Sequence, residues 1–135
     1  MKFYRLLSVS AAILLSLFAA KAQNTQQSPE QREKQMLEYI DKEVERLSGL
    51  LELEYWQEFY VDSTLTHDYQ ALTEELESLQ TAKVGNPDLY QAIQDKWAEQ
   101  IDKSYKRFFT EEQWQKYWKS GGKRAQAARD KRKKK

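Results

Sequence analysis

The 135-residue sequence contains no cysteine, one histidine, two prolines and four glycines. The absence of cysteine excludes disulfides, thiol chemistry and cysteine-ligated metal sites, so packing alone must hold the fold. The sequence also lacks a glycine-rich phosphate loop and any spacing typical of metal ligands. The single histidine, His67, has no activated nucleophile near it, and we interpret it as a surface residue of a helix. These absences predict a non-enzymatic protein with no catalytic residues, no cofactor and no metal.

No stretch of the chain alternates apolar and polar residues with period two, so no strands are expected. Apolar residues recur instead every three or four positions, the spacing of one helix face. Four helices are predicted, at about 29–48, 54–83, 87–108 and 111–120. The predicted fold class is therefore all-α, with four helices joined by short turns in a hairpin-like structure or a small bundle. Weak helix formers at 61–64 favour a bend in the second helix.

Cap and turn residues set the predicted helix boundaries. Ser28 and Thr110 each stand three residues before a glutamine, which is the spacing of a capping box. Asn86 precedes a proline and an aspartate, as expected of a cap at a helix start. Gly49 and Gly85 follow helical patterns, and we expect them to end the first two helices, with Gly85 in a left-handed conformation.

The first residues have the three parts of a secretory signal peptide. Two basic residues lie in Met1–Arg5, an apolar run of fifteen residues follows, and a small-x-small site ends at Ala22. The run is shorter than the roughly 20 residues that span a membrane. The expected organisation is a signal peptide at 1–22, a disordered linker at 23–28, a helical domain at 29–120 and a basic flexible tail at 121–135. The expected location is the periplasm or the exterior.

Charge is distributed unevenly along the chain. Between Leu47 and Ala82 there are eight acidic residues and no lysine or arginine, whereas from Gln113 onward ten basic residues stand against Asp130 alone. A solvated acidic face and a flexible basic tail explain this pattern. In an exported protein the tail predicts weak contact with anionic surfaces and no nucleic acid partner.

Aromatic residues are numerous for so small a domain. Most fall on the apolar stripes and are expected in the core, but some rings should remain uncovered, and uncovered apolar surface commonly marks a binding face. The candidate client- or partner-binding aromatics are Trp56, Tyr60, Trp97, Trp114 and Trp118.

Two short motifs share one pattern. Leu53–Gln57 (LEYWQ) and Phe109–Gln113 (FTEEQ) each consist of an apolar residue, a cap-like residue, two variable residues and glutamine. The motif residues singled out are Gln57, Thr110 and Gln113. The motifs resemble those of the Spy/CpxP-type periplasmic proteins, also called LTxxQ proteins. The resemblance covers roughly 30–120 and implies a helical hairpin-like fold, often a cradle-shaped homodimer, whose members bind unfolded clients or act in envelope stress sensing.

Two functions are therefore expected from the sequence. The first is chaperone-like binding of unfolded polypeptides in the periplasm, and the alternative is an envelope structural or interaction protein with a dedicated protein partner. A homodimer is expected because long amphipathic helices in a short chain leave apolar stripes that one copy does not bury.

Overall fold

The computed structural model describes residues 27–135 and divides the chain into two units, Met1–Gln35 and Met36–Lys135. Helix α2 (Pro29–Leu51) begins in the first unit and continues through the second. The predicted signal peptide and most of the predicted linker lie outside the described residues. Among residues 27–135, no helix has an apolar stretch sufficient to cross a membrane.

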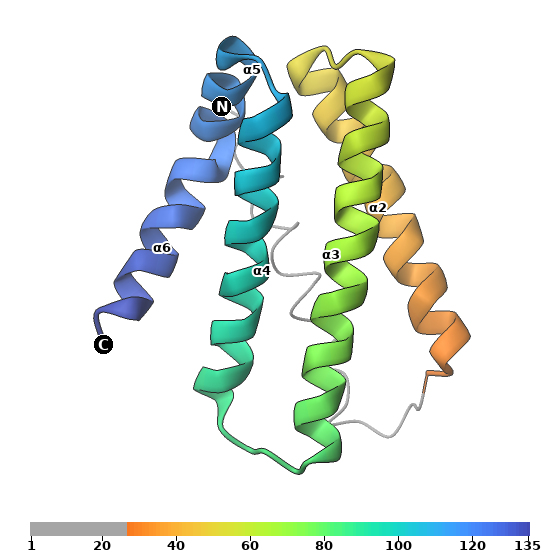
Figure 1. Ribbon diagram of the computed structural model, residues 1–135, viewed down its shortest axis with the longest axis vertical. Helices are drawn as coiled ribbons and strands as arrows, with labels where there is room; N and C mark the ends of the chain where they lie inside the picture. The colour runs from red at the N-terminus through yellow and green to blue at the C-terminus, as the bar shows by residue number, and fades with distance from the viewer. Residues whose placement is uncertain (1–26) are drawn as a thin grey trace, which may run out of the picture. The chain divides into compact units, whose positions relative to one another are not determined.

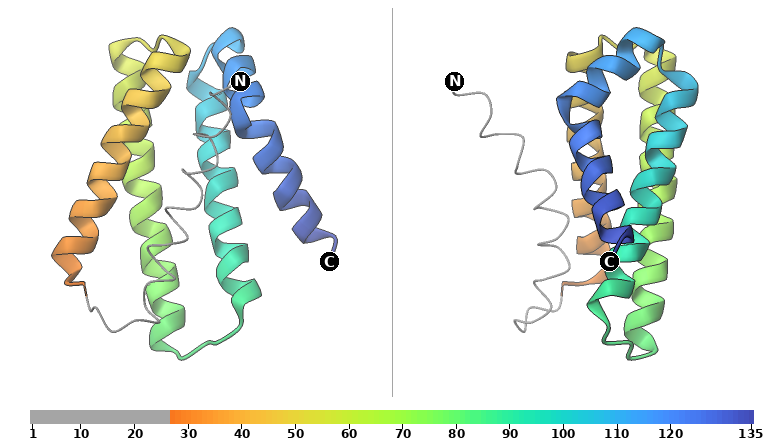
Figure 2. Two further views of the ribbon diagram at one scale, coloured as in Figure 1. Left: turned by 180° about the vertical axis from the view of Figure 1, so that it is seen from behind. Right: turned by 90° about the vertical axis from the view of Figure 1, so that its left-hand side faces the viewer.

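The prediction of an all-α fold is confirmed, and residues 27–135 contain no strand. After α2 come α3 (Tyr55–Thr81), α4 (Pro87–Phe108), α5 (Glu111–Tyr117), a π-helical turn η3 (Trp118–Gly122) and α6 (Lys123–Lys133). Within residues 36–135, α2, α3 and α4 run alternately up and down, and α6 returns beside α4 (Figure 1). A view from the side places α2 and α6 on the same side of the α3–α4 pair (Figure 2).

The predicted caps form at three helix starts. Ser28 and Gln31 make the reciprocal hydrogen bonds of a capping box, at 3.1 and 3.2 Å. The Asn86 side chain accepts a hydrogen bond of 3.0 Å from the amide of Asp88 at the start of α4. Thr110 caps α5 by accepting from an amide one turn later. The sequence predicts these helix starts because each cap side chain binds an amide only two or three positions later.

The predicted ends of the first two helices are wrong in position, whereas α4 ends at Phe108 as predicted. Helix α2 continues past Gly49 to Leu51, whose burial in the core holds the extra residues, and Glu52 then takes the left-handed conformation (φ 53°). Similarly, Lys83 rather than Gly85 is left-handed after α3 (φ 57°). The bend expected at 61–64 does not interrupt α3, because this part of the helix is anchored by buried Val61.

The core lies where α2 ends, α3 begins and α4 ends. Its buried members are Ile40, Leu47, Leu51, Val61, Leu65, Ile101, Tyr105 and Phe109. The ring of Tyr105 stacks on Phe109 at 5.0 Å and meets Tyr117 edge-on at 5.3 Å. Full burial of such side chains stabilises the fold by about 1.5–3 kcal/mol each. This cluster brings the starts of α3 and α5 together, and with them the two sequence motifs.

The expected flexible tail at 121–135 requires correction. Residues 123–133 form α6, and the chain enters it through η3, where Gly121 departs from helical dihedrals (φ 160°, ψ −20°). Gly122 is buried against the rings of Trp118 and Tyr117. Basic side chains of α6, not large apolar ones, dock the helix on α4. The absence of large apolar residues after Trp118 therefore did not mean the absence of structure.

Candidate functional site

The two motif glutamines lie against each other, although 56 positions separate them in sequence. Gln57 is on the first turn of α3 and Gln113 on the first turn of α5. The Nε2 group of Gln57 donates to Oε1 of Gln113 (2.7 Å), and Nε2 of Gln113 donates to Oε1 of Gln57 (3.0 Å). The exchange of hydrogen bonds joins the two motifs directly.

Each glutamine also closes its own helix start and binds the other motif's turn. The side-chain oxygens accept from the amides of Glu54 and Thr110, both at 2.9 Å. The second hydrogen of Gln57 Nε2 goes to the carbonyl of Phe108 (3.0 Å), and that of Gln113 Nε2 goes to the carbonyl of Leu51 (3.3 Å). Every donor and acceptor site of both amides is thereby used. The arrangement is a positioning device with no nucleophile, acid or base, and it fixes the start of α3.

The first turns of α3 carry an exposed aromatic patch, defined as Tyr55, Trp56, Phe59 and Tyr60. Their exposed fractions are 87%, 47%, 63% and 51%. At 100° per residue these four positions fall on the side of α3 opposite its buried residues, of which Gln57 and Val61 are the nearest. The sequence reasoning selected Trp56 and Tyr60 but missed Tyr55 and Phe59, and this helical spacing was the signal that could have found them.

Three of the four rings of the patch, those of Trp56, Phe59 and Tyr60, are linked by ring contacts. Trp56 and Phe59 both meet Tyr60 edge-on, at 6.0 and 5.9 Å between centroids, and Tyr60 lies 5.7 Å from the ring of Phe108 on α4. The Trp56 indole N–H donates to the Glu54 carboxylate. Aromatic rings supported in this way present large contact area with little side-chain entropy left to lose on binding.

The other three candidate tryptophans lie elsewhere and are partly buried. Trp114 packs against the core and stacks on Trp118 at 5.5 Å. Lys106 Nζ lies 5.6 Å from the ring centroid of Trp114, and Lys96 Nζ lies 5.1 Å from that of Trp97. Within residues 27–135, none of the three makes a ring contact with the aromatic patch. The structure therefore separates the five candidates instead of gathering them into one surface.

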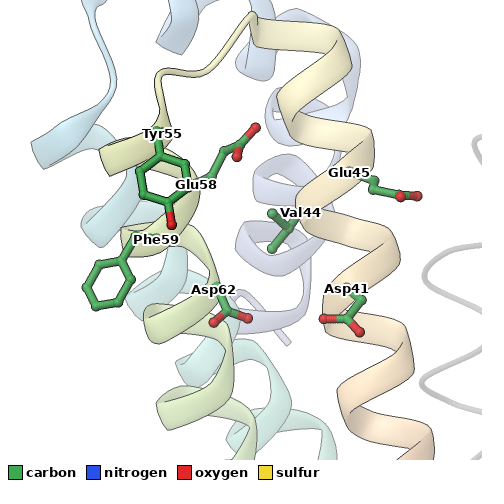
Figure 3. A pocket seen from close by; sticks show the side chains of 7 residues that line it. All are labelled: Asp41, Val44, Glu45, Tyr55, Glu58, Phe59 and Asp62. Carbon is green, nitrogen blue, oxygen red and sulfur yellow. The ribbon is translucent and has the colours of Figure 1, made fainter.

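An open groove of about 500 Å³ separates α2 from α3 beside the patch (Figure 3). We call it the acidic groove, and it is lined by Asp41, Val44, Glu45, Tyr55, Glu58, Phe59 and Asp62. Two rings of the aromatic patch form part of one wall, and carboxylates come from both helices. Apart from the hydrogen bond that Ser48 donates to Glu58, no partner within residues 27–135 engages these four carboxylates.

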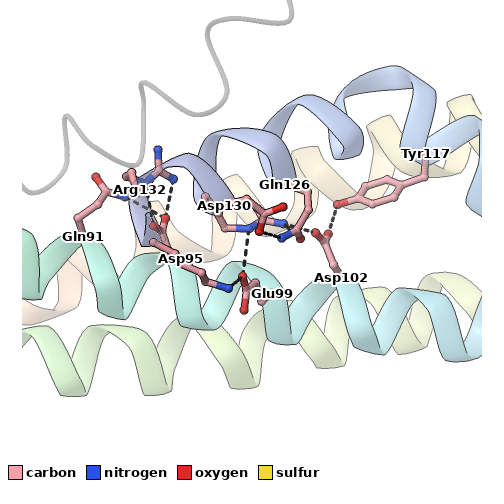
Figure 4. Close-up of polar contacts among 10 residues, drawn as sticks. Gln91, Asp95, Glu99, Asp102, Tyr117, Gln126, Asp130 and Arg132 are labelled. Atoms are coloured by element: carbon pink, nitrogen blue, oxygen red, sulfur yellow. Dashed lines mark hydrogen bonds and ion pairs between the residues drawn. The ribbon is translucent and has the colours of Figure 1, made fainter. Parts of the chain in front are cut away.

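A second set of carboxylates lies on α4 and is paired with α6 (Figure 4). Arg132 binds Asp95 through two hydrogen bonds, of 2.7 and 2.8 Å, and Lys133 contacts Glu99. Arg129, whose side chain is 5% exposed, donates to Asp102 at 2.6 Å. These contacts form a charge ladder along the two helices, defined by the pairs Asp95–Arg132, Glu99–Lys133 and Asp102–Arg129.

The contacts of the charge ladder change the pKa values of Asp95 and Glu99, and the pKa of the neighbouring Tyr117 is also changed. Partial burial acts to raise the pKa of Asp95, but hydrogen bonds from Arg132 and Gln91 and nearby positive charge lower it overall. A hydrogen bond from Lys133 lowers the pKa of Glu99. Burial, followed by the negative charge of Asp102, holds the pKa of Tyr117 well above its usual range. Tyr117 therefore stays protonated and donates to Asp102 at 2.5 Å.

His67 lies on an exposed part of α3 with its Nδ1 2.7 Å from the Asp68 carboxylate. Its side chain is 77% exposed, whereas that of Asp68 is 8% exposed. No group of three or more metal-binding side chains occurs in the part of the chain that the structure describes.

No family model, curated protein or solved structure matches the chain. The site is distinguished by its geometry: an exposed aromatic surface, three of whose four rings are linked by ring contacts, beside a groove whose carboxylates have no basic partner within residues 27–135.

Proposed function

We propose that this chain is a non-enzymatic, exported protein that binds unfolded polypeptides in a chaperone-like manner, as the Spy/CpxP-type resemblance implies. The single observation that carries the proposal is the exposure of four adjacent aromatic residues on α3, Tyr55, Trp56, Phe59 and Tyr60. Exposed apolar surface of this kind marks interaction sites, and tyrosine and tryptophan tolerate one wet edge when no partner is bound.

The glutamine pair supports the proposal by fixing the patch. Gln57 is 1% exposed and bonded on every side, so the residues immediately around it begin α3 in one defined position. A surface organised before binding loses less entropy when it takes up a client.

Suppression of aggregation tests the proposal. The protein at stoichiometric amounts should reduce the light scattering of a chemically unfolded client, and a Tyr55→Gln/Phe59→Gln variant should lose most of this effect. Both residues are exposed, so circular dichroism should report an unchanged fold. Leu37→Gln/Leu89→Gln is the matched control, because it also removes two exposed apolar side chains (42% and 46% exposed) but lies outside the patch. Equal suppression by both variants would refute a role for the patch.

The alternative is a dedicated protein partner in the cell envelope. A pull-down from envelope extract that yields one stoichiometric partner, dependent on Tyr55 and Phe59, would favour this alternative over broad client binding. The homodimer expected from the sequence is part of the proposal, and sedimentation that shows only a monomer at high micromolar concentration would remove it.

A further inference from the structure

Two sets of acidic residues in the described part of the chain differ in their partners. Those of the charge ladder on α4 are each engaged by a basic side chain of α6. Those of the acidic groove, Asp41, Glu45, Glu58 and Asp62, have no basic group within 4.0 Å in residues 27–135. The groove lining contains no lysine or arginine. Negative charge in the groove is therefore left for a partner from outside to neutralise.

The lining of the same groove also includes apolar groups. Val44 lies on α2, and the rings of Tyr55 and Phe59 stand on α3 beside the carboxylates of Glu58 and Asp62 (Figure 3). The face of an aromatic ring attracts a cation. A lysine or arginine side chain packs its aliphatic stem on apolar surface while its charged head reaches polar groups. The groove offers both, because its lining contains apolar groups and carboxylates.

The length of the groove limits what it holds at one time. From Tyr55 to Asp62 the α3 wall is two helical turns, or about 10 Å at 1.5 Å per residue. An extended chain rises about 3.3 Å per residue, so the wall spans about three residues. The occupant is thus a short stretch of a longer polypeptide, such as one basic residue and the bulky apolar residues next to it.

We infer that the acidic groove and the aromatic patch together select polypeptide segments in which lysine or arginine adjoins a bulky apolar residue. This inference rests on the proposed function and names its client class. Segments in which aspartate or glutamate adjoins an apolar residue are excluded, because their carboxylates would be repelled by the four carboxylates of the groove. Electrostatic complementarity of this kind sets partner choice more than it adds raw affinity.

Three labelled peptides of equal length test the inference by fluorescence anisotropy with the purified protein. One contains lysine and leucine, the second glutamate and leucine, and the third lysine and serine. The lysine-leucine peptide should bind at least about tenfold more tightly than either of the others at low salt. Its advantage over the glutamate-leucine peptide should shrink as salt rises to about 0.5 M, since exposed charges are then screened within a few ångströms.

Charge-neutral variants assign the selectivity to the groove. Asp41→Asn/Asp62→Asn should weaken binding of the lysine-leucine peptide by about tenfold, at about threefold for each exposed ion pair lost. The fold should survive, because both side chains are exposed. Glu74→Gln/Glu112→Gln is the matched control, since it removes the same charge from exposed sites outside the groove and should change binding less than twofold.

The outcomes separate this inference from the proposed function. If the glutamate-leucine peptide binds as tightly as the lysine-leucine peptide, or the two double variants behave alike, cation selectivity is wrong. The proposed function still stands in that case if Tyr55→Gln/Phe59→Gln abolishes binding of both leucine peptides. If no peptide binds and no client is protected from aggregation, both are wrong.

Discussion

At the scale of single residues, Gln57 and Gln113 are the most constrained side chains of the site. Each is bonded to the other, to its own cap and to a carbonyl of the opposite turn. A typical hydrogen bond adds only about 1 kcal/mol to stability, but a buried group left without its partner costs about 1–3 kcal/mol. Loss of one glutamine therefore costs more than the bonds it made.

We predict that Gln57→Ala and Gln113→Ala each lower the free energy of unfolding by about 2–4 kcal/mol, as measured by urea denaturation. The double variant should lose at least about 1 kcal/mol less than the sum, because each single change already removes both bonds between the two amides. Gln115→Ala is the control, since its exposed bond to Glu111 should matter little. Strictly additive losses would show that the two glutamines do not act as a pair.

Lys83 gives a second prediction at this scale. A non-glycine residue in the left-handed region costs about 1–2 kcal/mol, and glycine removes that cost but adds about 0.5–1 kcal/mol of chain entropy. Lys83→Gly should therefore raise the free energy of unfolding by about 0.5–1 kcal/mol in denaturant titrations. Gly85→Ala, at a position without positive φ and with nothing within 4 Å, should be neutral or slightly stabilising. Marked destabilisation by Gly85→Ala would contradict this assignment.

The sequence predicted residue-level features where their causes are local. The caps at Ser28, Asn86 and Thr110 follow from side chains within three positions of the groups they bind. The glycines did not mark the positions of the left-handed residues. Because Leu51 is buried in the core, α2 continues two residues beyond Gly49, and Glu52 takes the left-handed conformation. The hydrogen bonds between the two glutamines could not be predicted either, because no local sequence pattern indicates that two turns 56 residues apart lie side by side.

At the scale of helices, α6 is the element that the sequence did not predict. Its partners on α4, Asp95, Glu99 and Asp102, lie about thirty positions earlier in the chain. A search for apolar periodicity passes over such a helix, because its docking relies on charge. By contrast, α3 and α4 were predicted nearly to their ends, since their buried residues recur with helical spacing.

The entry into α6 gives a prediction about Gly122. A methyl group there would lie 3.1 Å from Trp118 Cε3 and 3.2 Å from Tyr117 Cε1, closer than ordinary contact. Gly122→Ala should displace the rings and weaken the docking of α6, seen as faster amide hydrogen exchange in residues 123–133. Gly49→Ala, inside α2 with open space around it, should instead stabilise the protein by about 1 kcal/mol. Unchanged exchange in Gly122→Ala would mean that the rings of Trp118 and Tyr117 move aside without weakening the docking of α6.

The charge ladder makes α6 docking sensitive to acid. Because docking lowers the pKa of Asp95 and Glu99, the undocked state binds more protons. The stabilisation is therefore complete above the ordinary carboxyl pKa values, near 4, and declines as pH falls through the lowered ones. The protection factors of the α6 amides, which compare exchange with the intrinsic rate at each pH, should fall between about pH 5 and pH 3, and Arg132→Gln should reduce this pH dependence. Docking that is equally strong at pH 3 and pH 7 would contradict the role of the ladder.

At the scale of the whole molecule, the core and the charged C-terminal region are separable. No member of the core cluster, and no side chain packed on it, lies beyond Tyr117. Deletion of 122–135 should therefore leave the helices between Met36 and Phe108 folded, with circular dichroism losing the helicity of α6 alone. The α4 carboxylates that lose their partners become exposed to water, which limits the loss of stability. Global unfolding of the truncated protein would overturn this separation.

The same deletion tests contact with anionic membranes. Arg129, Arg132 and Lys133 form ion pairs with α4, and five exposed basic residues of the C-terminal region form no ion pair within residues 27–135: Lys123, Arg124, Lys131, Lys134 and Lys135. Each contributes about 1 kcal/mol near an anionic surface and is screened within a Debye length. The protein should bind anionic liposomes weakly in low salt, and the truncated protein should not. Binding that survives high salt would indicate an apolar anchor instead.

The paired turns also have a consequence for the order in which the chain folds. α3 and α4 are neighbours in sequence, so their contacts form early, whereas the glutamine pair must close a loop of 56 residues before it gains any bond. We therefore expect the glutamine pair, a non-covalent cross-link, to form late in folding and to break early in unfolding. The contact that holds the start of α3, which carries the exposed rings, against the start of α5 is then expected to be among the last to form. Under the proposed function, a client would meet a surface whose position depends on Gln113, 56 positions away from Gln57.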